Sequence, residues 1–309
     1  RRSLTREEAA DAMGMILRGE ASPAQTGAFL MLLRVKEETP EELAGFLDAC
    51  RPLCAEHLAE LPAVDVDWPS YAGKKKHHPW YLLVARLLAD NGLRILMHGG
   101  PAHTPNRRYS DDMLAELGLA LPASVAEAGE QLDSDGLTYL DLGHFCPALP
   151  ELLMMRFQLG LRSPINTLAR SLNPAAAPLS MQSVFHPAYL ELHLGAASAC
   201  GDRNLLLFKG EGGELEIRPD ARTALTGLRH GEPAEGVLSA AMGRQTPPGE
   251  VSVAPLQALW RGRADDAYGE AAVIKTVAAV LWGLEKVASL EEGEKAAAAL
   301  WEARRRDRL

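Results

Sequence analysis

Apolar residues recur every three or four positions through residues 5–58, which is the spacing of helices that bury one face. A Ser or Thr followed three residues later by Glu or Gln marks the start of each predicted helix. These signals run from Thr5 to Glu8, from Ser22 to Gln25 and from Thr39 to Glu42. Helices of this length cannot close a core alone, so we expect them to pack on a later helical segment or on a second subunit.

Beyond residue 61, short apolar runs alternate with longer helical patterns. Strands are expected at residues 64–66, 93–98 and 136–142, and helices at residues 80–91, 110–117 and 123–131. A strand, a helix and a second strand joined by short links predict a parallel sheet, whose ligand loops lie at the carboxyl ends of the strands. The loops 67–80 and 99–108 should therefore open on the same edge of the sheet.

The second half of the chain continues this alternation, which places the protein in the α/β class. A Met- and Leu-rich helix is expected at residues 148–160, followed by strands at 180–185 and 204–208 around a helix at 187–198. A hairpin-like segment should begin at residues 215–217, and helices at 270–288 and 294–303 close the chain. With 309 residues, the chain is long enough for two domains or for one large α/β domain.

The loop 67–80 carries the first candidate chemistry, because Gly73 is followed by Lys74, Lys75 and Lys76. A loop that grips one phosphate with backbone amides usually has several glycines, since a Cβ would keep the backbone away from the anion. Mobile lysine side chains instead favour a surface for polyanions. A solvated basic turn without a partner is an equal alternative on the loop alone.

Net charge and cysteine content limit the class of protein. The net charge of −9 argues against indiscriminate binding of nucleic acid, but it leaves room for a local basic face. No apolar run reaches the roughly 18 residues of a membrane helix, and the N-terminus does not resemble a signal peptide. The four cysteines show no disulfide spacing, and Cys50 and Cys54 are expected in a helical core rather than at a metal. We therefore expect a cytoplasmic protein without a membrane partner.

A set of short motifs, spread over nearly the whole chain, carries a resemblance to a known family. They include Leu4-Thr-Arg-Glu-Glu-Ala, Gly19-Glu-Ala-Ser-Pro-Ala-Gln25, Gly27-Ala-Phe-Leu30, Leu33-Arg-Val-Lys-Glu-Glu-Thr-Pro-Glu-Glu42, His98-Gly99, Gly160-Leu-Arg162, Asn166 and Asn173-Pro174. In this order they resemble the anthranilate phosphoribosyltransferase family, which is the third glycosyltransferase family.

The resemblance implies a phosphoribosyltransferase-like fold of the nucleoside phosphorylase/anthranilate phosphoribosyltransferase type. Residues 1–62, with roughly 146–175, would form a helical domain. Residues 63–145 and 176–309 would form an α/β domain with a mixed, mainly parallel sheet. The resemblance also implies a homodimer that forms through the helical domain.

Departures from the family fall on its chemistry. The Gly-Thr-Gly-Gly-Asp motif, which wraps phosphoribosyl pyrophosphate in the family, corresponds to Tyr71-Ala-Gly-Lys-Lys75 here. Lys-His-Gly-Asn corresponds to Met97-His-Gly-Gly100, and the acceptor-pocket His-Pro to Cys146-Pro147. Gly-Pro-Leu-Thr-Asn-Pro corresponds to Ala169-Arg-Ser-Leu-Asn-Pro174, and the magnesium-binding Asp-Glu to Leu215-Glu216. Arg162 matches the arginine that holds the acceptor carboxylate.

These losses have a chemical consequence, because phosphoribosyl transfer needs amide donors and Mg²⁺ to stabilise the charge of the leaving pyrophosphate. Without the glycine cradle and the aspartate, the standard mechanism is not expected. Basic residues, Lys74 to Lys76 and Arg170, stand where the family keeps glycine, aspartate or proline. In this respect the chain resembles a divergent branch of the family whose members are associated with nucleic-acid binding.

Two functions follow from these departures. The first is a homodimer that binds nucleic acid, with single-stranded DNA or RNA favoured, through phosphate contacts along a basic cleft edge. The residues assigned to that edge are Lys74, Lys75, Lys76, His98, Arg107, Arg108, Arg170 and Lys209. Tyr71, Trp80 and Tyr109 would either stack on unpaired bases or pack as ordinary core and rim residues.

The second function is pentosyl transfer from phosphoribosyl pyrophosphate to anthranilate or a related aromatic acceptor. The resemblance then assigns Gly100, Cys146 and Arg162 to the acceptor pocket and Glu216 to a magnesium ion. Both residues also have a purely structural alternative. Arg162 would be an ordinary arginine at the start of a helix, and Glu216 would be a solvent-facing residue of the hairpin. No cofactor is expected for nucleic-acid binding, and magnesium is expected only if the transferase hypothesis holds.

Overall fold

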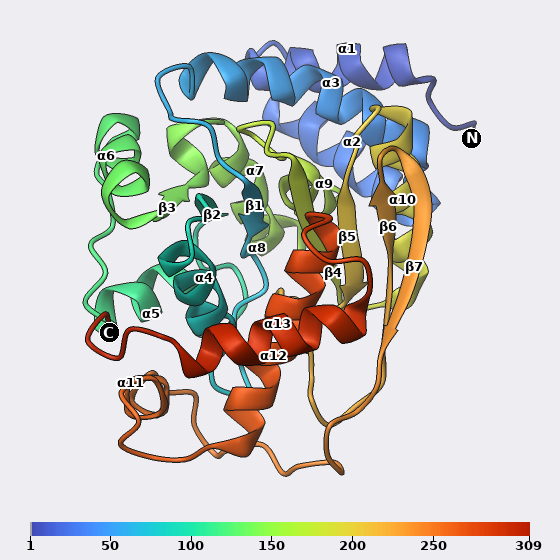
Figure 1. Cartoon of the computed structure of the whole chain (residues 1–309). Coiled ribbons are helices and arrows are strands. Elements are labelled where there is room, and N and C mark those ends of the chain that lie inside the picture. The colour runs from blue at the N-terminus through green and yellow to red at the C-terminus, as the bar shows by residue number, and fades with distance from the viewer. Residues whose placement is uncertain (1) are drawn as a thin grey trace.

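Three capped helices form one layer at the N-terminal end of the fold. The computed structural model describes residues 2–309. Capping boxes at Thr5, Ser22 and Thr39 begin α1 (Arg6–Leu17), α2 (Pro23–Lys36) and α3 (Pro40–His57), as predicted. In each box the capping hydroxyl and the Glu or Gln side chain satisfy two backbone N–H groups that the helix cannot satisfy itself. The three helices lie together at the top of Figure 1.

A seven-stranded sheet forms the centre of the molecule (Figure 1). Its strands are β1 (Val66–Pro69), β2 (Ile95–Gly99), β3 (Leu137–Asp141), β4 (Leu179–Val184), β5 (Leu205–Lys209), β6 (Thr223–Arg229) and β7 (Glu232–Leu238). Their order is β3-β2-β1-β4-β5-β6-β7. The strands from β3 to β5 are parallel, and β6 and β7 add an antiparallel hairpin. The predicted mixed, mainly parallel sheet is therefore confirmed.

Helices cover both faces of this sheet. On one face, α4 (Tyr81–Asp90), α12 (Ala267–Gly283) and α13 (Leu290–Glu302) contribute to the largest apolar core. A second core joins the N-terminal layer to α7 (Leu149–Met154), α8 (Arg156–Leu159) and α9 (Ile165–Ser171). The remaining helices are α5 (Ser110–Glu116), α6 (Val125–Asp135), α10 (Leu190–Ala199) and α11 (Ala254–Trp260).

The second core supports the expectation that α1 to α3 pack on a later helical segment. Cys50 and Cys54 are buried in it as free thiols, as predicted. The same core also includes Leu96 of β2 and Leu140 of β3, so the helical layer is continuous with the sheet. The domain limits at residues 62, 146 and 175 stay a prediction.

Two local expectations are wrong. The helix expected at 148–160 is divided at Met155, which caps both α7 and α8. Residues 215–217 form no strand, because Leu215 and Ile217 are buried in the main core and the Ile217 amide donates to Thr276 Oγ1 of α12. The hairpin instead lies in β6 and β7.

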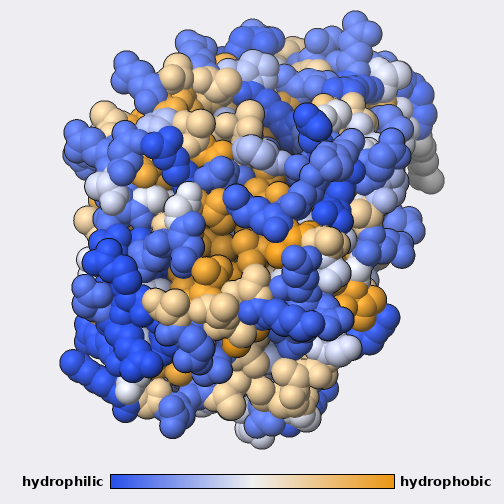
Figure 2. All heavy atoms as spheres, viewed as in Figure 1, coloured by the Kyte–Doolittle hydropathy of each residue, from blue (hydrophilic) through white to orange (hydrophobic). Residues whose placement is uncertain are grey.

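The surface in Figure 2 is largely hydrophilic, with hydrophobic residues gathered near the middle of the face on which α12 and α13 lie. Within residues 2–309, no helix combines the length and the apolar composition that crossing a bilayer requires.

Candidate functional site

The sheet changes its direction of winding between β1 and β4. From β1 the chain continues to β2 and β3 on one side, whereas β4 and β5 extend the sheet on the other side. In open α/β sheets, ligands bind outside the carboxyl ends of the strands at such a point. Residues 70–80 follow β1, and residues 185–189 follow β4, so these two segments frame the candidate site.

The loops after β1 and β2 open on the same edge of the sheet, as predicted. Lys74 and Arg108 form an isolated antiparallel bridge in which each amide donates to the other's carbonyl, at 2.8 and 2.9 Å. Arg107 reinforces this contact, because its Nη1 donates to the carbonyls of Ala72, Gly73 and Gly212. The Arg108 guanidinium pairs with Glu116 and also donates to the Val251 carbonyl. Both arginines therefore hold the loops together.

The prediction that Lys74 belongs to an exposed basic turn is wrong. Its side chain is 0% exposed, and its Nζ lies 2.5 Å from Glu211 Oε2 and 2.6 Å from Glu216 Oε1. These carboxylates raise the pKa of Lys74 against the lowering effect of burial. Lys75 and Lys76 are exposed, so two of the three lysines remain available to a partner.

The alternative in which Glu216 is a solvent-facing hairpin residue is wrong. It is buried, its Oε1 accepts from Lys74 and its Oε2 accepts from the Tyr81 amide at 2.9 Å. Burial raises the pKa of Glu216 to about 7, although Lys74 opposes this shift. Because both oxygens already have donors, this arrangement does not fit a magnesium ion.

A buried carboxylate that the sequence analysis missed lies inside the same turn. Glu214 Oε1 accepts from the amides of Ala72 and Gly73 at 2.7 and 2.5 Å, and Oε2 accepts from the Ser70 hydroxyl at 2.8 Å. Burial raises the pKa of Glu214, while these donors lower it. The available signal was charge: Glu211, Glu214 and Glu216 lie in one short acidic segment that could face the lysines.

His98 is fully buried, so the prediction that it contacts a phosphate is wrong. Its Nε2 donates to Asp67 Oδ1 at 2.9 Å, and its Nδ1 accepts from the Tyr71 hydroxyl at 2.8 Å. Tyr71, Trp80 and Tyr109 are likewise buried. These three aromatic residues pack in the interior rather than stack on a base.

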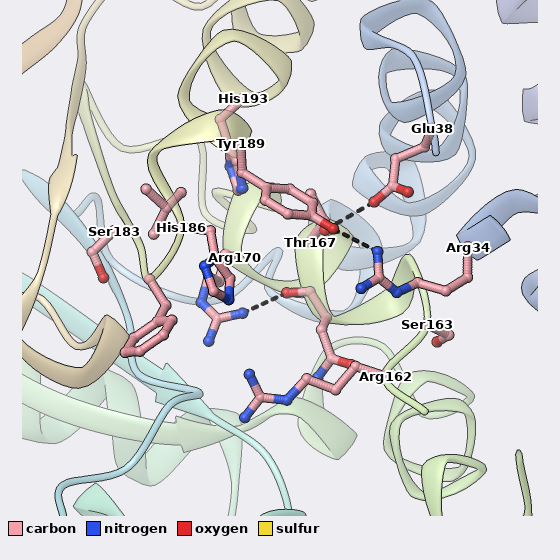
Figure 3. Close-up of a pocket in the computed structure, with 13 residues that line it drawn as sticks. Arg34, Glu38, Arg162, Ser163, Thr167, Arg170, Ser183, His186, Tyr189 and His193 are labelled. Atoms are coloured by element: carbon pink, nitrogen blue, oxygen red, sulfur yellow. Dashed lines mark hydrogen bonds between the residues drawn. The ribbon is translucent and has the colours of Figure 1, made fainter. Parts of the chain in front are cut away.

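An open cavity of about 180 Å³ lies beside the turn, between the helical layer and the end of β4. We call it the arginine cavity, because Arg34 of α2, Arg162 before α9 and Arg170 of α9 project into it (Figure 3). Its other lining residues are Glu38, Ser163, Asn166, Thr167, Ser183, Val184, Phe185, His186, Tyr189 and His193. Glu38 is the one carboxylate among the lining residues that the structure describes.

The arginines of this cavity donate to hydroxyl and carbonyl oxygens. Arg34 Nη1 donates to the Tyr189 hydroxyl at 2.7 Å, and Arg170 Nη1 donates to the Asn166 carbonyl at 2.8 Å (Figure 3). Arg162 Nη2 donates to Thr104 Oγ1 at 2.9 Å. Guanidinium groups have five N–H donors each, so these bonds leave further donors for a ligand.

Positive charge accumulates around Arg162. Burial, followed by the nearby charges of Arg170, Arg156 and Arg107, lowers the pKa of Arg162 to about 10. The group stays protonated at neutral pH, and an anion in the cavity would relieve this repulsion. The cavity is therefore suited to a phosphate or a carboxylate.

The structure brings together only some of the predicted site residues. Arg162 and Arg170 share the cavity, whereas Gly100 and Cys146 are buried and are not among its lining residues. Gly100 and Cys146 therefore do not share the arginine cavity with Arg162, and their assignment to an acceptor pocket stays a prediction. Lys209 is exposed at the end of β5, opposite Val184.

Sequence reasoning missed several cavity residues, namely Arg34, Phe185, His186 and Tyr189. Arg34 is one basic residue on an amphipathic helix, and such residues usually face solvent. The other three follow β4, which was predicted one residue too long at its end. Nothing in the local pattern connects these two segments.

Comparison with known proteins identifies related sequences. The helical bundle domain of a glycosyl transferase family matches residues 1–54, and the a/b domain of a glycosyl transferase family matches residues 82–303. An anthranilate phosphoribosyltransferase of Myxococcus xanthus is 32% identical over 230 residues, which cover 74% of this chain and 68% of the relative. The uncharacterised protein YbiB of Escherichia coli K12 is 31% identical over 225 residues, which cover 71% of this chain and 68% of that protein.

A solved structure agrees with this assignment. The crystal structure of anthranilate phosphoribosyltransferase from Thermus thermophilus has a TM-score of 0.78 at 25% identity, with 97% of this chain and 92% of that chain covered. The match therefore includes both the helical layer and the sheet. The resemblance seen in the sequence motifs is confirmed, and the chain belongs to glycosyltransferase family 3, the anthranilate phosphoribosyltransferase family.

Proposed function

We propose that this chain is a homodimeric, anthranilate-phosphoribosyltransferase-like protein that binds nucleic acid and has lost standard phosphoribosyl transfer. Single-stranded DNA or RNA is the favoured partner. The observation that carries the proposal is the arginine cavity, where guanidinium groups from separate segments converge at the switch point of the sheet. Its location favours a ligand site, and its charge favours an anion.

Arginine is suited to phosphate because its planar guanidinium can donate two parallel hydrogen bonds to one phosphate group. Arg34 and Arg162 retain free donors, and both approach the cavity from its walls (Figure 3). One phosphate of a nucleic-acid backbone would thus meet two or more cations. Such contacts give affinity that falls with salt and carries no sequence information.

Aromatic residues at the rim favour a single strand over a duplex. Phe185 is 51% exposed and, with Tyr189, lines the cavity. An unpaired base can stack on such a ring, whereas a paired base keeps its faces inside the duplex. Lys75, Lys76 and Lys209 are exposed and would contact further phosphates of the same strand. The anionic body of the protein, with a net charge of −9, would repel nucleic acid elsewhere.

The alternative is pentosyl transfer from phosphoribosyl pyrophosphate to anthranilate or a related aromatic acceptor. The relatives that bear the name anthranilate phosphoribosyltransferase and the position of Arg162 in the cavity favour it. The hydrogen bonds of Glu214 and Glu216 argue against it, because both carboxylates already accept from groups of the chain and are not free to hold a metal ion. Calorimetry with phosphoribosyl pyrophosphate and Mg²⁺ separates the two functions, since tight magnesium-dependent binding supports the transferase.

The experiment for nucleic-acid binding is fluorescence anisotropy with a labelled single-stranded oligonucleotide at increasing salt. We expect affinity to fall with salt, and Arg162→Ala to weaken binding about tenfold, or about 1.4 kcal/mol. The slope of log affinity against log salt should fall by about 0.7 for the one lost phosphate contact. Arg34→Ala should act in the same way.

Arg18→Ala is the matched control, because Arg18 is an exposed arginine paired with Glu20 away from the cavity. It should leave both affinity and salt slope unchanged. The proposal is rejected if the wild-type chain does not bind at low salt, or if its affinity is indifferent to salt. Equal losses in Arg18→Ala and Arg162→Ala would show that the cavity has no special role.

A second copy of the chain is the proposed protein partner. Leu32 and Val35 of α2 are 72% and 80% exposed, which leaves part of the helical layer without apolar contacts. Burying such residues against their counterparts would remove that surface from water. A cytoplasmic location, expected from the cysteine usage, is part of the same proposal.

A further inference from the structure

The turn after β1 packs against the segment 211–216, and buried charges of both signs lie where the two meet. The Lys74 ammonium lies between the carboxylates of Glu211 and Glu216, at 2.5 and 2.6 Å. The Glu214 carboxylate accepts from the amides of Ala72 and Gly73 in the same turn. All four charged side chains come from the segments 74 and 211–216, and each is nine-tenths or more buried.

The position of the Lys74 ammonium has the chemistry of a cation site. Two carboxylates approach one point from the same loop, and hard divalent cations prefer such oxygen ligands. Glu211 Oε2 lies 2.5 Å from the Lys74 ammonium and has no other partner within the described residues. One ammonium also neutralises only one of the two carboxylates, whereas a divalent ion would neutralise both.

The position of the Glu214 carboxylate has the chemistry of an anion site. Consecutive backbone amides and a hydroxyl that point at one spot are the donors that usually hold a phosphate oxygen. Gly73 makes this geometry possible, because its φ of +68° is a left-handed conformation that favours glycine. An added Cβ would also lie 3.0 Å from the Arg108 carbonyl oxygen.

We infer that the chain occupies a cation position and an anion position with its own side chains, Lys74 and Glu214, and that the cation position accepts a divalent metal ion once Lys74 is removed. This goes beyond the proposed function, because nucleic-acid binding in the arginine cavity does not require either ion. It also explains why a basic residue can stand in this turn without facing solvent. The lysine serves as a counter-ion for a carboxylate pair.

The experiment titrates Mn²⁺ into the full chain and measures free Mn²⁺ by electron paramagnetic resonance. Wild-type protein should show no saturable Mn²⁺ binding that is lost when Glu216 is replaced by glutamine. Lys74→Ala, which leaves the two carboxylates without their ammonium, should gain one Mn²⁺ per chain and bind it at least tenfold more tightly. That gain should vanish in the double variant Lys74→Ala/Glu216→Gln. Added Mn²⁺ should also raise the Tm of Lys74→Ala.

Lys75→Ala is the matched control, because it removes the neighbouring exposed ammonium and should gain no metal. If wild-type protein binds one Mn²⁺ and Glu216→Gln abolishes it, Lys74 is not the occupant and the inference is overturned. It is also overturned if Lys74→Ala binds no Mn²⁺, or stays unfolded both with and without the metal. Oligonucleotide binding is measured on the same samples and tests the arginine cavity separately.

Discussion

At the scale of single residues, buried histidines near the arginine cavity make the stability of the fold depend on pH. His193 of α10 lines the cavity, and its Nδ1 donates to Gln182 Oε1 at 2.7 Å. Burial, and then the charge of Arg170, lowers the pKa of His193 to about 3. Burial likewise lowers the pKa of His103, to about 4. Both imidazoles are therefore neutral in the folded protein at neutral pH.

A folded-state pKa below the unfolded value of about 6.5 gives stability that is fully present above pH 6.5 and is lost as the pH falls towards the folded value. As the pH falls from about 7.5 to about 4.5, the free energy of unfolding should decrease in the wild type. In His193→Gln we expect this decrease to be about 2–3 kcal/mol smaller. Urea unfolding at several pH values measures this difference. An unchanged pH dependence in the variant would show that His193 titrates normally in the fold.

At the scale of elements, the crossing of α1 and α3 depends on a glycine. A Cβ added to Gly45 of α3 would lie 2.2 Å from the Arg6 carbonyl oxygen and 2.7 Å from the Ala9 Cβ. The two helices can therefore approach closely only where this side chain is missing. Gly14 of α1 differs, because its Cβ would meet only the flexible end of Arg18.

We predict that Gly45→Ala destabilises the fold by about 1–3 kcal/mol, because two packed helices must separate. Gly14→Ala should instead be neutral or stabilise by up to about 1 kcal/mol, since alanine is the better helix former. Denaturant unfolding of both variants makes a matched comparison. Equal changes in the two variants would mean that the helix crossing is not sensitive to the added methyl group.

At the scale of the whole molecule, one exposed apolar region and one cationic cavity lie on the same helical layer. Leu32 and Val35 are on α2, which also supplies Arg34 to the cavity. Gly27 of the same helix would place a Cβ 3.4 Å from Leu159, so α2 also contacts α8. A dimer formed through α2 would thus bring two cavities into one particle.

We expect Leu32→Glu/Val35→Glu to convert the proposed dimer to a monomer, because a buried glutamate at the interface would lack a counter-ion. Light scattering coupled to gel filtration should show half the wild-type mass. Affinity for a long single strand should fall, whereas affinity for a short oligonucleotide should not, since only the long strand reaches two cavities. Val237→Glu, on the exposed face of β7, is the control. A monomeric wild type would remove the basis of this prediction.

Much of the fold followed from local rules in the sequence. Thr5, Ser22 and Thr39 begin their helices because the capping groups lie within three residues of one another. The strands around residues 66, 95 and 137 were found for a similar reason, as apolar runs bounded by turn residues. Short links between them then required a parallel arrangement.

The site was decided by contacts that no local pattern encodes. Lys74 looked like an exposed cation because its sequence neighbours are basic, but Glu211 and Glu216, more than 130 residues later, surround it. Arg34 and Tyr189 meet in the cavity across 155 positions of the chain. Sequence by itself determined the family, the three capped N-terminal helices and the class of sheet, since these depend on spacing and composition. Only the tertiary structure decided which charges face each other in the interior and which face a partner, because burial and ion pairing depend on distances in space.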